Sequence, residues 1–322
     1  MRAFIFPGQG SQAVGMGLAL AEASPAARQA FDAVDEALGQ NLFRLMTDGP
    51  EEELTLTENA QPAIMANAIA TLRAFEEAAG PSLAANTQLA NRADFVAGHS
   101  LGEYSALCAA DSFDLATAAR LLKLRGRSMQ AAVPVGQGAM AALLGVDVDQ
   151  ARAIAAAAAQ GEICTLANDN DPTQKVISGH RGAIERALEI AKAMGAKRAL
   201  LLPVSAPFHC ALMAPAATAM ESALADVALA APAVPLYANV TAAPVRAPDE
   251  IKRLLVEQVV GMVRWRESVL AMAAAGVDHF VELGGKILGG MVRRIVPEAK
   301  VTSLVSIADI EALAGEASDV RS

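Results

Sequence analysis

The sequence has 322 residues, of which 53% are apolar and only 4% aromatic, so it can bury a large core built mainly from aliphatic side chains. Its formal net charge of −9 argues against phosphate-backbone binding, and we expect no nucleic-acid partner. No apolar run reaches the roughly 18 residues of a membrane span, and Cys108, Cys164 and Cys210 lack metal-site spacing. We therefore expect a cytoplasmic protein without a membrane partner, metal or cofactor.

The first residues predict a short strand followed by a glycine-rich loop. Residues 3–6 are apolar, and the loop PGQGSQ (residues 7–12) follows directly. This loop lacks the Gly-x-Gly-x-x-Gly pattern and the Lys-Ser/Thr pair that phosphate-binding loops use. We expect it instead to bring backbone N–H groups close to a reacting carbonyl group. Helices are predicted over residues 25–38, after Ser24 and before Gly39, and over residues 59–79, with an acidic loop at residues 51–53 between them.

A strand-turn-helix signature follows at residues 94–110. An apolar run at residues 95–97 predicts a buried parallel strand, and helix-forming residues dominate from Leu101 onward. Between them, Gly98 and Gly102 flank Ser100 in the Gly-x-Ser-x-Gly pattern of a nucleophile elbow. At such a turn the serine adopts an unfavourable backbone conformation, and its hydroxyl projects at the carboxyl edge of the sheet. The pattern therefore indicates a serine nucleophile near the N-terminus of a helix, where an oxyanion can be stabilised.

The helix predicted over residues 114–132 places an arginine on its apolar side. On a helical wheel Arg125 falls among the apolar residues Ala118, Leu121, Leu122 and Met129. A guanidinium in that position needs an anionic partner, because an unpaired buried charge is very costly. The partner is either a core carboxylate in a structural salt bridge or a substrate carboxylate held by two parallel hydrogen bonds.

An inserted unit is predicted next. Its strands and helices follow in the order β-α-β-β-α-β, at residues 139–146, 149–160, 163–168, 175–178, 181–194 and 197–204. This order is typical of the split, ferredoxin-like unit. Alternating strands and helices then resume, including a helix over residues 249–263. We expect a small ferredoxin-like subdomain at residues 135–204 and a large α/β domain at residues 1–134 and 205–322.

A serine nucleophile needs a general base, and the sequence holds four histidines. His99 adjoins Ser100 and should point away from its hydroxyl. His180 lies at a turn, and His279 lies in a predicted strand. His209 lies in a proline-bounded loop that returns from the insertion to the main sheet, so we expect it to be the base. No acid after a main-domain strand stands between the two residues, and a backbone carbonyl or an amide could orient the imidazole instead.

Several segments together resemble those of malonyl-CoA:acyl carrier protein transacylases. They are FPGQGSQ at residues 6–12, GHSLGEY at residues 98–104, the Arg125-Gly126 pair and Pro207-Phe208-His209. The resemblance extends over about residues 1–307. It implies a large α/β-hydrolase-like domain with a mostly parallel sheet and an inserted ferredoxin-like subdomain.

The resemblance also implies roles for individual residues. By matching position, Ser100 corresponds to the nucleophile, His209 to the base and Arg125 to the clamp on the malonyl carboxylate. Gln9 and Leu101 match the residues whose backbone N–H groups form the oxyanion hole. The resemblance thus adds the oxyanion hole to the residues already singled out.

Residues nearby carry further implications. Gln258 matches a glutamine whose main-chain carbonyl orients the histidine, which would explain the missing acid. Phe208 precedes His209, and in polyketide-type relatives a phenylalanine there accompanies malonyl. A family asparagine near the pocket falls within residues 168–170, and the sequence leaves open whether Asn168 or Asn170 has that place.

The function implied is transfer of malonyl from malonyl-CoA to the phosphopantetheine thiol of acyl carrier protein, through a malonyl-serine intermediate, for fatty acid biosynthesis. The expected partners are malonyl-CoA and acyl carrier protein, and we expect a monomer. Three alternatives remain: an acyltransferase of a polyketide-type pathway, a serine esterase or thioesterase, and a non-catalytic module that binds the carrier protein.

Overall fold

A mostly parallel sheet runs through the larger part of the molecule. The computed structural model describes residues 1–80, 89 and 92–319. Within these residues the sheet consists of β1 (Arg2–Phe6), β2 (Phe95–Gly98), β7 (Leu236–Ala238), β8 (Ala243–Val245), β9 (His279–Leu283) and β10 (Lys300–Leu304). Their order is β10-β9-β1-β2-β7-β8, and the neighbouring pairs are parallel except β7 with β8. The predicted α/β architecture with a mostly parallel sheet is confirmed.

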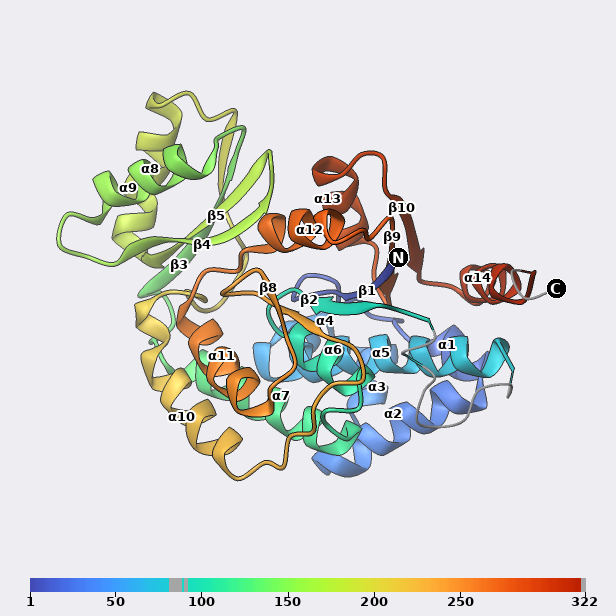
Figure 1. Ribbon diagram of the computed structural model, residues 1–322. Coiled ribbons are helices and arrows are strands. Elements are labelled where there is room, and N and C mark those ends of the chain that lie inside the picture. Colours follow the sequence, from blue (N-terminus) through green and yellow to red (C-terminus); the bar gives the residue numbers. More distant parts are fainter. Residues whose placement is uncertain (81–88, 90–91, 320–322) are drawn as a thin grey trace.

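Helices cover both faces of this sheet, because successive side chains of a strand point to opposite faces. In β1, Phe4 and Phe6 enter the larger core, whereas Ala3 and Ile5 enter the core that contains Trp265. The helices of the larger core are α1 (Leu18–Ala23), α2 (Pro25–Leu38), α3 (Leu42–Asp48), α4 (Glu51–Thr55), α5 (Thr57–Ala78), α6 (Gly102–Ala109), α7 (Leu115–Ala131), α10 (Ala214–Ala225), α11 (Pro248–Val260) and α14 (Ile307–Asp319). The opposite face carries α12 (Trp265–Ala274) and α13 (Ile287–Ile295). Figure 1 shows α5, α6 and α7 on one side of the sheet and α12 and α13 on the other.

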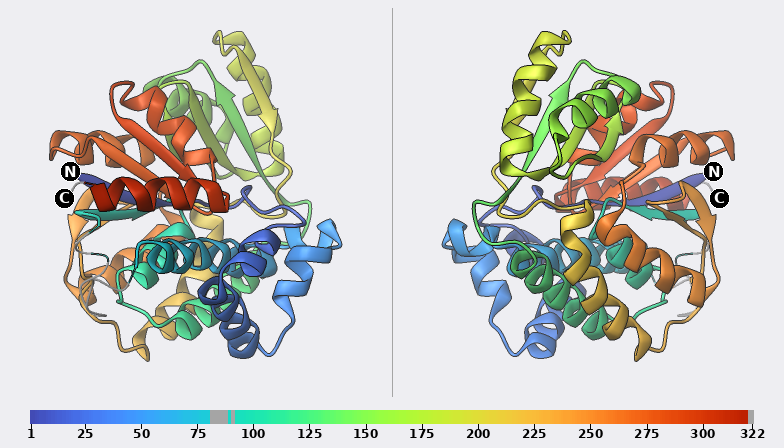
Figure 2. Two further views of the ribbon diagram at one scale, coloured as in Figure 1. Left: turned by 90° about the vertical axis from the view of Figure 1, so that its right-hand side faces the viewer. Right: turned by 90° about the vertical axis from the view of Figure 1, so that its left-hand side faces the viewer.

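Residues 138–201 form a second sheet with a core of its own. Its elements are β3 (Gly138–Leu144), α8 (Val148–Ala159), β4 (Cys164–Asp171), β5 (Gln174–His180), α9 (Arg181–Ala193) and β6 (Arg198–Leu201). The strand order is β4-β5-β3-β6, with antiparallel pairs throughout. We call residues 138–201 the four-stranded unit. It stands beside the six-stranded sheet, with α8 and α9 on its far side (Figures 1 and 2), and its β-α-β-β-α-β order agrees with the prediction.

Local sequence explains where several helices begin and end. The Ser24 side chain accepts a hydrogen bond from the N–H of Ala27 at the start of α2, and Asp114 does the same at the start of α7. Gly39 ends α2 in the left-handed conformation, with φ of 57°. Helix α5 ends at Ala78, where the sequence predicts an end before Gly80-Pro81; of that pair, Pro81 lies outside the described residues.

The predicted acidic loop is wrong, because residues 51–53 open helix α4. Three carboxylates in the first turn interact favourably with the partial positive charge of a helix N-terminus, so an acidic run can start a helix. Helices α1, α3 and α10 and the short 3₁₀ turn η1 (Ala211–Met213) are likewise absent from the sequence prediction.

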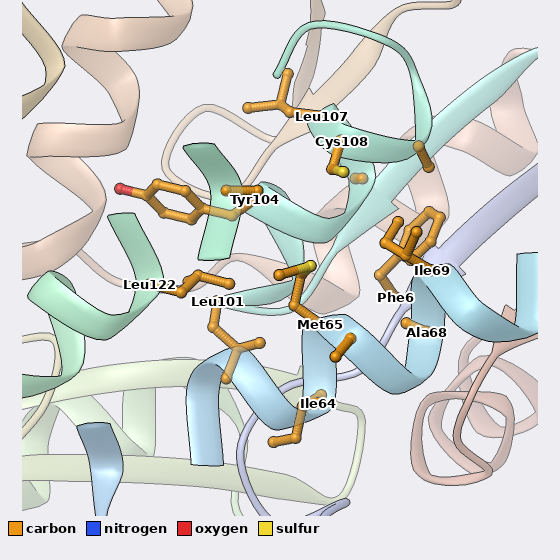
Figure 3. Packing of buried hydrophobic residues seen from close by; sticks show 14 of the residues in the cluster. Phe6, Ile64, Met65, Ala68, Ile69, Leu101, Tyr104, Leu107, Cys108 and Leu122 are labelled. Atoms are coloured by element: carbon orange, nitrogen blue, oxygen red, sulfur yellow. The ribbon is translucent and has the colours of Figure 1, made fainter. Parts of the chain in front are cut away.

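Helix α5 packs against the start of the helix that follows Ser100. Figure 3 shows Leu101 and Tyr104, at the start of the elbow helix, beside Ile64 and Met65 of α5. All four side chains are at most 1% exposed. Burial of each large apolar side chain of this kind stabilises the fold by about 1.5–3 kcal/mol, so the turn that carries Ser100 rests on a packed core.

Candidate active site

The strand-turn-helix at Ser100 has the geometry of a nucleophile elbow. Ser100 lies between β2 and α6 with φ of 54°, a left-handed conformation that an L-residue rarely adopts. A Cβ on Gly98 would lie 1.9 Å from the carbonyl carbon of Gly102, and one on Gly102 would lie 2.3 Å from the carbonyl oxygen of Phe6. Both glycines are therefore required for the strand and the helix to pass so closely.

A buried asparagine holds this turn in place. Asn239 accepts a hydrogen bond from the Ser100 N–H at 2.8 Å and donates one to the Gly98 carbonyl at 2.7 Å. The N–H of Ser100 is thus occupied and cannot contribute to an oxyanion hole. Asn239 follows β7, well over a hundred residues along the chain, and no local sequence pattern predicts its place at the elbow.

Ser100 and His209 are in direct hydrogen-bond contact. Ser100 Oγ lies 2.8 Å from His209 Nε2, and His209 Nδ1 lies 2.9 Å from the Gln258 carbonyl oxygen and 3.2 Å from that of Gly261. Because a carbonyl only accepts, Nδ1 must carry the proton, and Nε2 is left to accept from the serine hydroxyl. Burial and the positive charge of Arg125 lower the pKa of His209 to about 3, so the ring is neutral at pH 7.

Arg125 is buried beside this pair without a carboxylate. Its guanidinium donates to Gln61 Oε1 at 2.9 Å, to Gln258 Oε1 at 2.7 Å and to Ser100 Oγ at 3.2 Å. Its Nε is buried without a partner, and in the part of the chain that the structure describes no Asp or Glu forms an ion pair with it. The geometry therefore gives no support to a structural salt bridge, and the cation faces the nucleophile with only neutral acceptors.

These groups open into a cavity of about 540 Å³ between the six-stranded sheet and the four-stranded unit. The large domain contributes Gln9, Gln61, Leu101, Arg125 and Phe208, among others, to its lining. The four-stranded unit and the segment after it contribute Met140, Asn168, Val176 and Leu202. A substrate that reaches Ser100 therefore contacts both parts of the molecule.

The predicted oxyanion-hole residues lie in this cavity. Gln9, in the loop after β1, and Leu101, directly after Ser100 in the elbow, both line it. Within the described ranges, their backbone N–H groups donate to no acceptor, whereas the neighbouring N–H of Gly10 donates to Gln12 Oε1 at 2.8 Å. Two free donors near a nucleophile can stabilise a negative oxygen.

The structure also distinguishes the two asparagines. Asn168 lines the cavity, and its Oδ1 is buried without a partner among the described atoms. Asn170 does not line the cavity; its Oδ1 lies 2.9 Å from His99 Nε2. His99 Nε2 thus contacts β4, where Asn168 Nδ2 also lies 3.5 Å from it, and burial lowers the pKa of His99.

The remaining histidines and possible metal ligands lie elsewhere. His180 accepts from the N–H of Ile163, and His279 lies 2.9 Å from Thr302 Oγ1; neither lines the cavity. Across residues 1–80, 89 and 92–319, no cluster of three or more His, Cys, Asp or Glu residues is placed to hold a metal ion. In the same residues no helix is both long and apolar enough to cross a membrane.

Comparison with known proteins shows a likeness over almost the whole chain. Residues 3–285 match the acyl transferase domain family. The malonyl CoA-acyl carrier protein transacylase of Escherichia coli K12 is 44% identical over 303 residues, which cover 94% of this chain and 95% of that protein. The structure of the acyl-carrier-protein S-malonyltransferase of Bartonella henselae has a TM-score of 0.93 and 49% identity, and covers 98% of this chain and 99% of that one. A malonyl-transacylase in complex with a type II polyketide acyl-carrier protein has a TM-score of 0.92 and 39% identity, with coverage of 98% and 99%.

Proposed function

This chain belongs to the acyl transferase domain family, and we propose that it transfers malonyl from malonyl-CoA to the phosphopantetheine thiol of an acyl carrier protein. The observation that carries the proposal is the Arg125 guanidinium, which lies 3.2 Å from Ser100 Oγ and has no carboxylate partner among the described residues. In a malonyl ester of Ser100 the free carboxylate lies two bonds beyond the acyl carbon. This carboxylate can therefore reach the Arg125 guanidinium and form an ion pair with it.

In the first half-reaction, Ser100 takes the acyl group. The Oγ–H proton passes to His209 Nε2 while Oγ bonds to the thioester carbon, and the N–H groups of Gln9 and Leu101 stabilise the oxyanion. The carbon–sulfur bond then breaks, and the coenzyme A sulfur takes the proton from His209. Between these two proton transfers His209 is an imidazolium, and the Gln258 and Gly261 carbonyl oxygens accept the hydrogen bond of its Nδ1–H.

The second half-reaction runs in the opposite sense. The phosphopantetheine thiol gives its proton to His209 Nε2 as its sulfur attacks the malonyl ester. Ser100 Oγ leaves and regains the proton, so the enzyme returns to its starting state. The transfer is a ping-pong reaction, and none of its steps requires a cofactor.

Two alternatives are less well supported. An esterase or thioesterase for neutral acyl groups would leave the buried charge of Arg125 unpaired in its acyl-enzyme, which is costly. A non-catalytic module that binds the carrier protein would have no use for the hydrogen bond between Ser100 and His209. An acyltransferase of a polyketide-type pathway uses the same chemistry, and it would differ in the pathway and carrier protein that it serves.

The test is the intact mass of the protein after mixing with malonyl-CoA. We expect a gain of one malonyl group on the parent, no gain on Ser100→Ala, and loss of the adduct from the parent when a carrier protein bearing phosphopantetheine is added. Circular dichroism of Ser100→Ala serves as the control for folding. Rapid hydrolysis of the adduct without transfer to the carrier would instead identify a thioesterase.

We extend the proposal to the organisation of the molecule. The antiparallel order β4-β5-β3-β6 and the β-α-β-β-α-β sequence of elements support a ferredoxin-like subdomain, to which we assign residues 135–204. Residues 1–134 and 205–322 then form an α/β-hydrolase-like domain. A monomeric state and a cytoplasmic location stay predictions from the sequence, and sedimentation velocity would test the first.

A further inference from the structure

A buried carboxyl group lies beneath the nucleophile and takes no part in the steps above. Glu103 is the second residue of α6 and is 1% exposed. Its Oε1 accepts a hydrogen bond from the Asn239 N–H at 2.6 Å, and its Oε2 accepts one from Gln258 Nε2. Burial raises the pKa of this carboxyl group, while its two hydrogen bonds and the charge of Arg125 oppose that rise.

The side chain of Gln258 connects this carboxyl group to the guanidinium. Gln258 Nε2 donates to Glu103 Oε2 and, at 2.9 Å, to the Ser100 carbonyl oxygen. Gln258 Oε1 accepts from Arg125 at 2.7 Å. Both amide hydrogens therefore have an acceptor, and this fixes which end of the amide faces Arg125.

We propose that Glu103 is a positioning residue that sets acyl selectivity, because it holds the Gln258 amide with its oxygen toward Arg125. The inference rests on the proposed function. With the oxygen so placed, Gln258 and Gln61 fix the guanidinium from two sides and leave its remaining N–H groups for a carboxylate. If the amide turned over, an NH₂ group would face a cation, and Arg125 would lose both an acceptor and its position.

Glu103→Gln tests this directly. The fixed Asn239 N–H requires the oxygen of the new amide, so its NH₂ group must face the NH₂ group of Gln258. The Gln258 amide can avoid this clash only by rotating, and its Nε2, which cannot accept a hydrogen bond, then faces Arg125. We expect the ratio of malonyl to acetyl kcat/KM to fall by about tenfold, in line with the loss of a hydrogen bond to a charged group. A merely structural role would lower both rates alike.

Gln258→Met provides an independent arm of the experiment. It keeps the main-chain carbonyl that orients His209 and removes the amide, so we expect the same fall in the ratio. In the Gln258→Met background, Glu103→Gln should lower the ratio no further, because the two residues act through one contact. Glu282→Gln is the matched control. Glu282 is also fully buried, but it accepts hydrogen bonds from the first N–H groups of α13. Its replacement should therefore leave the ratio of malonyl to acetyl kcat/KM unchanged.

Two results would overturn the inference. One is an unchanged ratio of malonyl to acetyl kcat/KM in Gln258→Met, a result that can be obtained even if Glu103→Gln does not fold. The other is a further fall in the double variant equal to that in Glu103→Gln alone. A parent protein with no preference for malonyl over acetyl would instead refute the proposed function, and the selectivity role with it.

Discussion

Among single residues, we propose that Arg125 determines through its charge which acyl groups the site accepts. The guanidinium is 1% exposed and is held by neutral oxygens from Gln61 and Gln258. Its charge is only partly compensated until a substrate brings a carboxylate. Selectivity for a charged acyl group therefore follows from the cost of burying an unpaired ion.

Arg125→Ala should separate charged from neutral acyl groups. We expect malonyl transfer to fall by about a hundredfold or more, because a buried carboxylate without its partner costs about 3–5 kcal/mol. Acetyl transfer should improve, since the unpaired cation is gone, and Arg125→Lys should be a poor substitute because an ammonium lacks the planar two-bond fork. The quantities to measure are kcat/KM for malonyl-CoA and acetyl-CoA and the Tm. Parallel losses for both substrates, together with a large fall in Tm, would contradict the clamp.

The environment of His209 predicts how activity depends on pH. Its pKa is lowered to about 3 by burial and by the charge of Arg125. We therefore expect acylation by malonyl-CoA in single-turnover measurements to show no loss centred near pH 6.5, the ordinary pKa of histidine. A decline with its midpoint near that pH would show that His209 is not the buried neutral imidazole that this structure describes.

The same shift predicts how stability depends on pH. Below about pH 6.5 the unfolded chain protonates this histidine, whereas the folded protein does so only near pH 3. The stabilising contribution is thus present above the unfolded pKa and is lost as pH falls toward the folded one. We expect the Tm to drop between pH 7 and pH 5 by less in His209→Ala than in the parent. Equal drops in the two proteins would refute this assignment.

At the scale of elements, the elbow depends on close backbone contact between β1, β2 and α6. A Cβ on Gly102 would lie 2.3 Å from the Phe6 carbonyl oxygen, and backbone at that distance must move. The loop that carries Gln9 follows Phe6, so displacement there also shifts an N–H group that we propose for the oxyanion hole. One methyl group is therefore expected to disturb both nucleophile and oxyanion site.

Gly102→Ala tests this contact. We expect a lower Tm and a loss of acylation by about tenfold or more, as for a misplaced oxyanion donor. Gly290→Ala is the matched control in helix α13, where a Cβ would meet only the end of the Arg294 side chain at 3.7 Å. Replacing a helical glycine there should stabilise the protein by up to about 1 kcal/mol. Similar Tm and activity for the two variants would show that the elbow tolerates a Cβ.

At the scale of the whole molecule, ion pairs join the four-stranded unit to the large domain. Asp169 of β4 lies 2.9 Å from Arg266 of α12, and Asp171 lies 2.7 Å from Arg294 of α13. Both carboxylates are fully buried, and Lys175 Nζ lies 3.2 Å from Asp169. The same stretch of β4 carries Asn168 into the cavity, so these contacts also fix one wall of the site.

Arg266→Ala should loosen that wall without touching the nucleophile. Asp169 keeps Lys175, so we expect a cost of about 1.5–3 kcal/mol, the range for hydrogen bonds to charged groups. The KM for malonyl-CoA should rise more than kcat falls, because the wall binds substrate and does no chemistry. Arg253→Ala, which removes an exposed pair with Glu257, is the control and should change stability by under about 1 kcal/mol. An unchanged KM in Arg266→Ala would mean that the unit is held mainly by apolar packing.

Features that depend on a local pattern could be predicted from the amino-acid sequence. The apolar strand, the paired glycines around Ser100 and the helix after it lie within one short segment, so periodicity and residue type suffice to predict an elbow. The position of Arg125 on a buried helix face follows from the same periodicity, and its burial is confirmed. The order of elements in the four-stranded unit could be read in the same way.

Which distant groups meet these residues depends on the packing of the folded chain. Asn239 reaches the elbow because the parallel strands β2 and β7 bring their carboxyl ends to one edge of the sheet, whatever their separation along the chain. Glu103 of α6 and Gln258 of α11 then meet there through the packing of two helices that share no local pattern. The choice between Asn168 and Asn170 was also beyond the sequence. The pairing of β4 with β5 shifts register on both sides of residues 168–169, and such bulges change which side chain faces a site through contacts that the sequence of one strand does not contain.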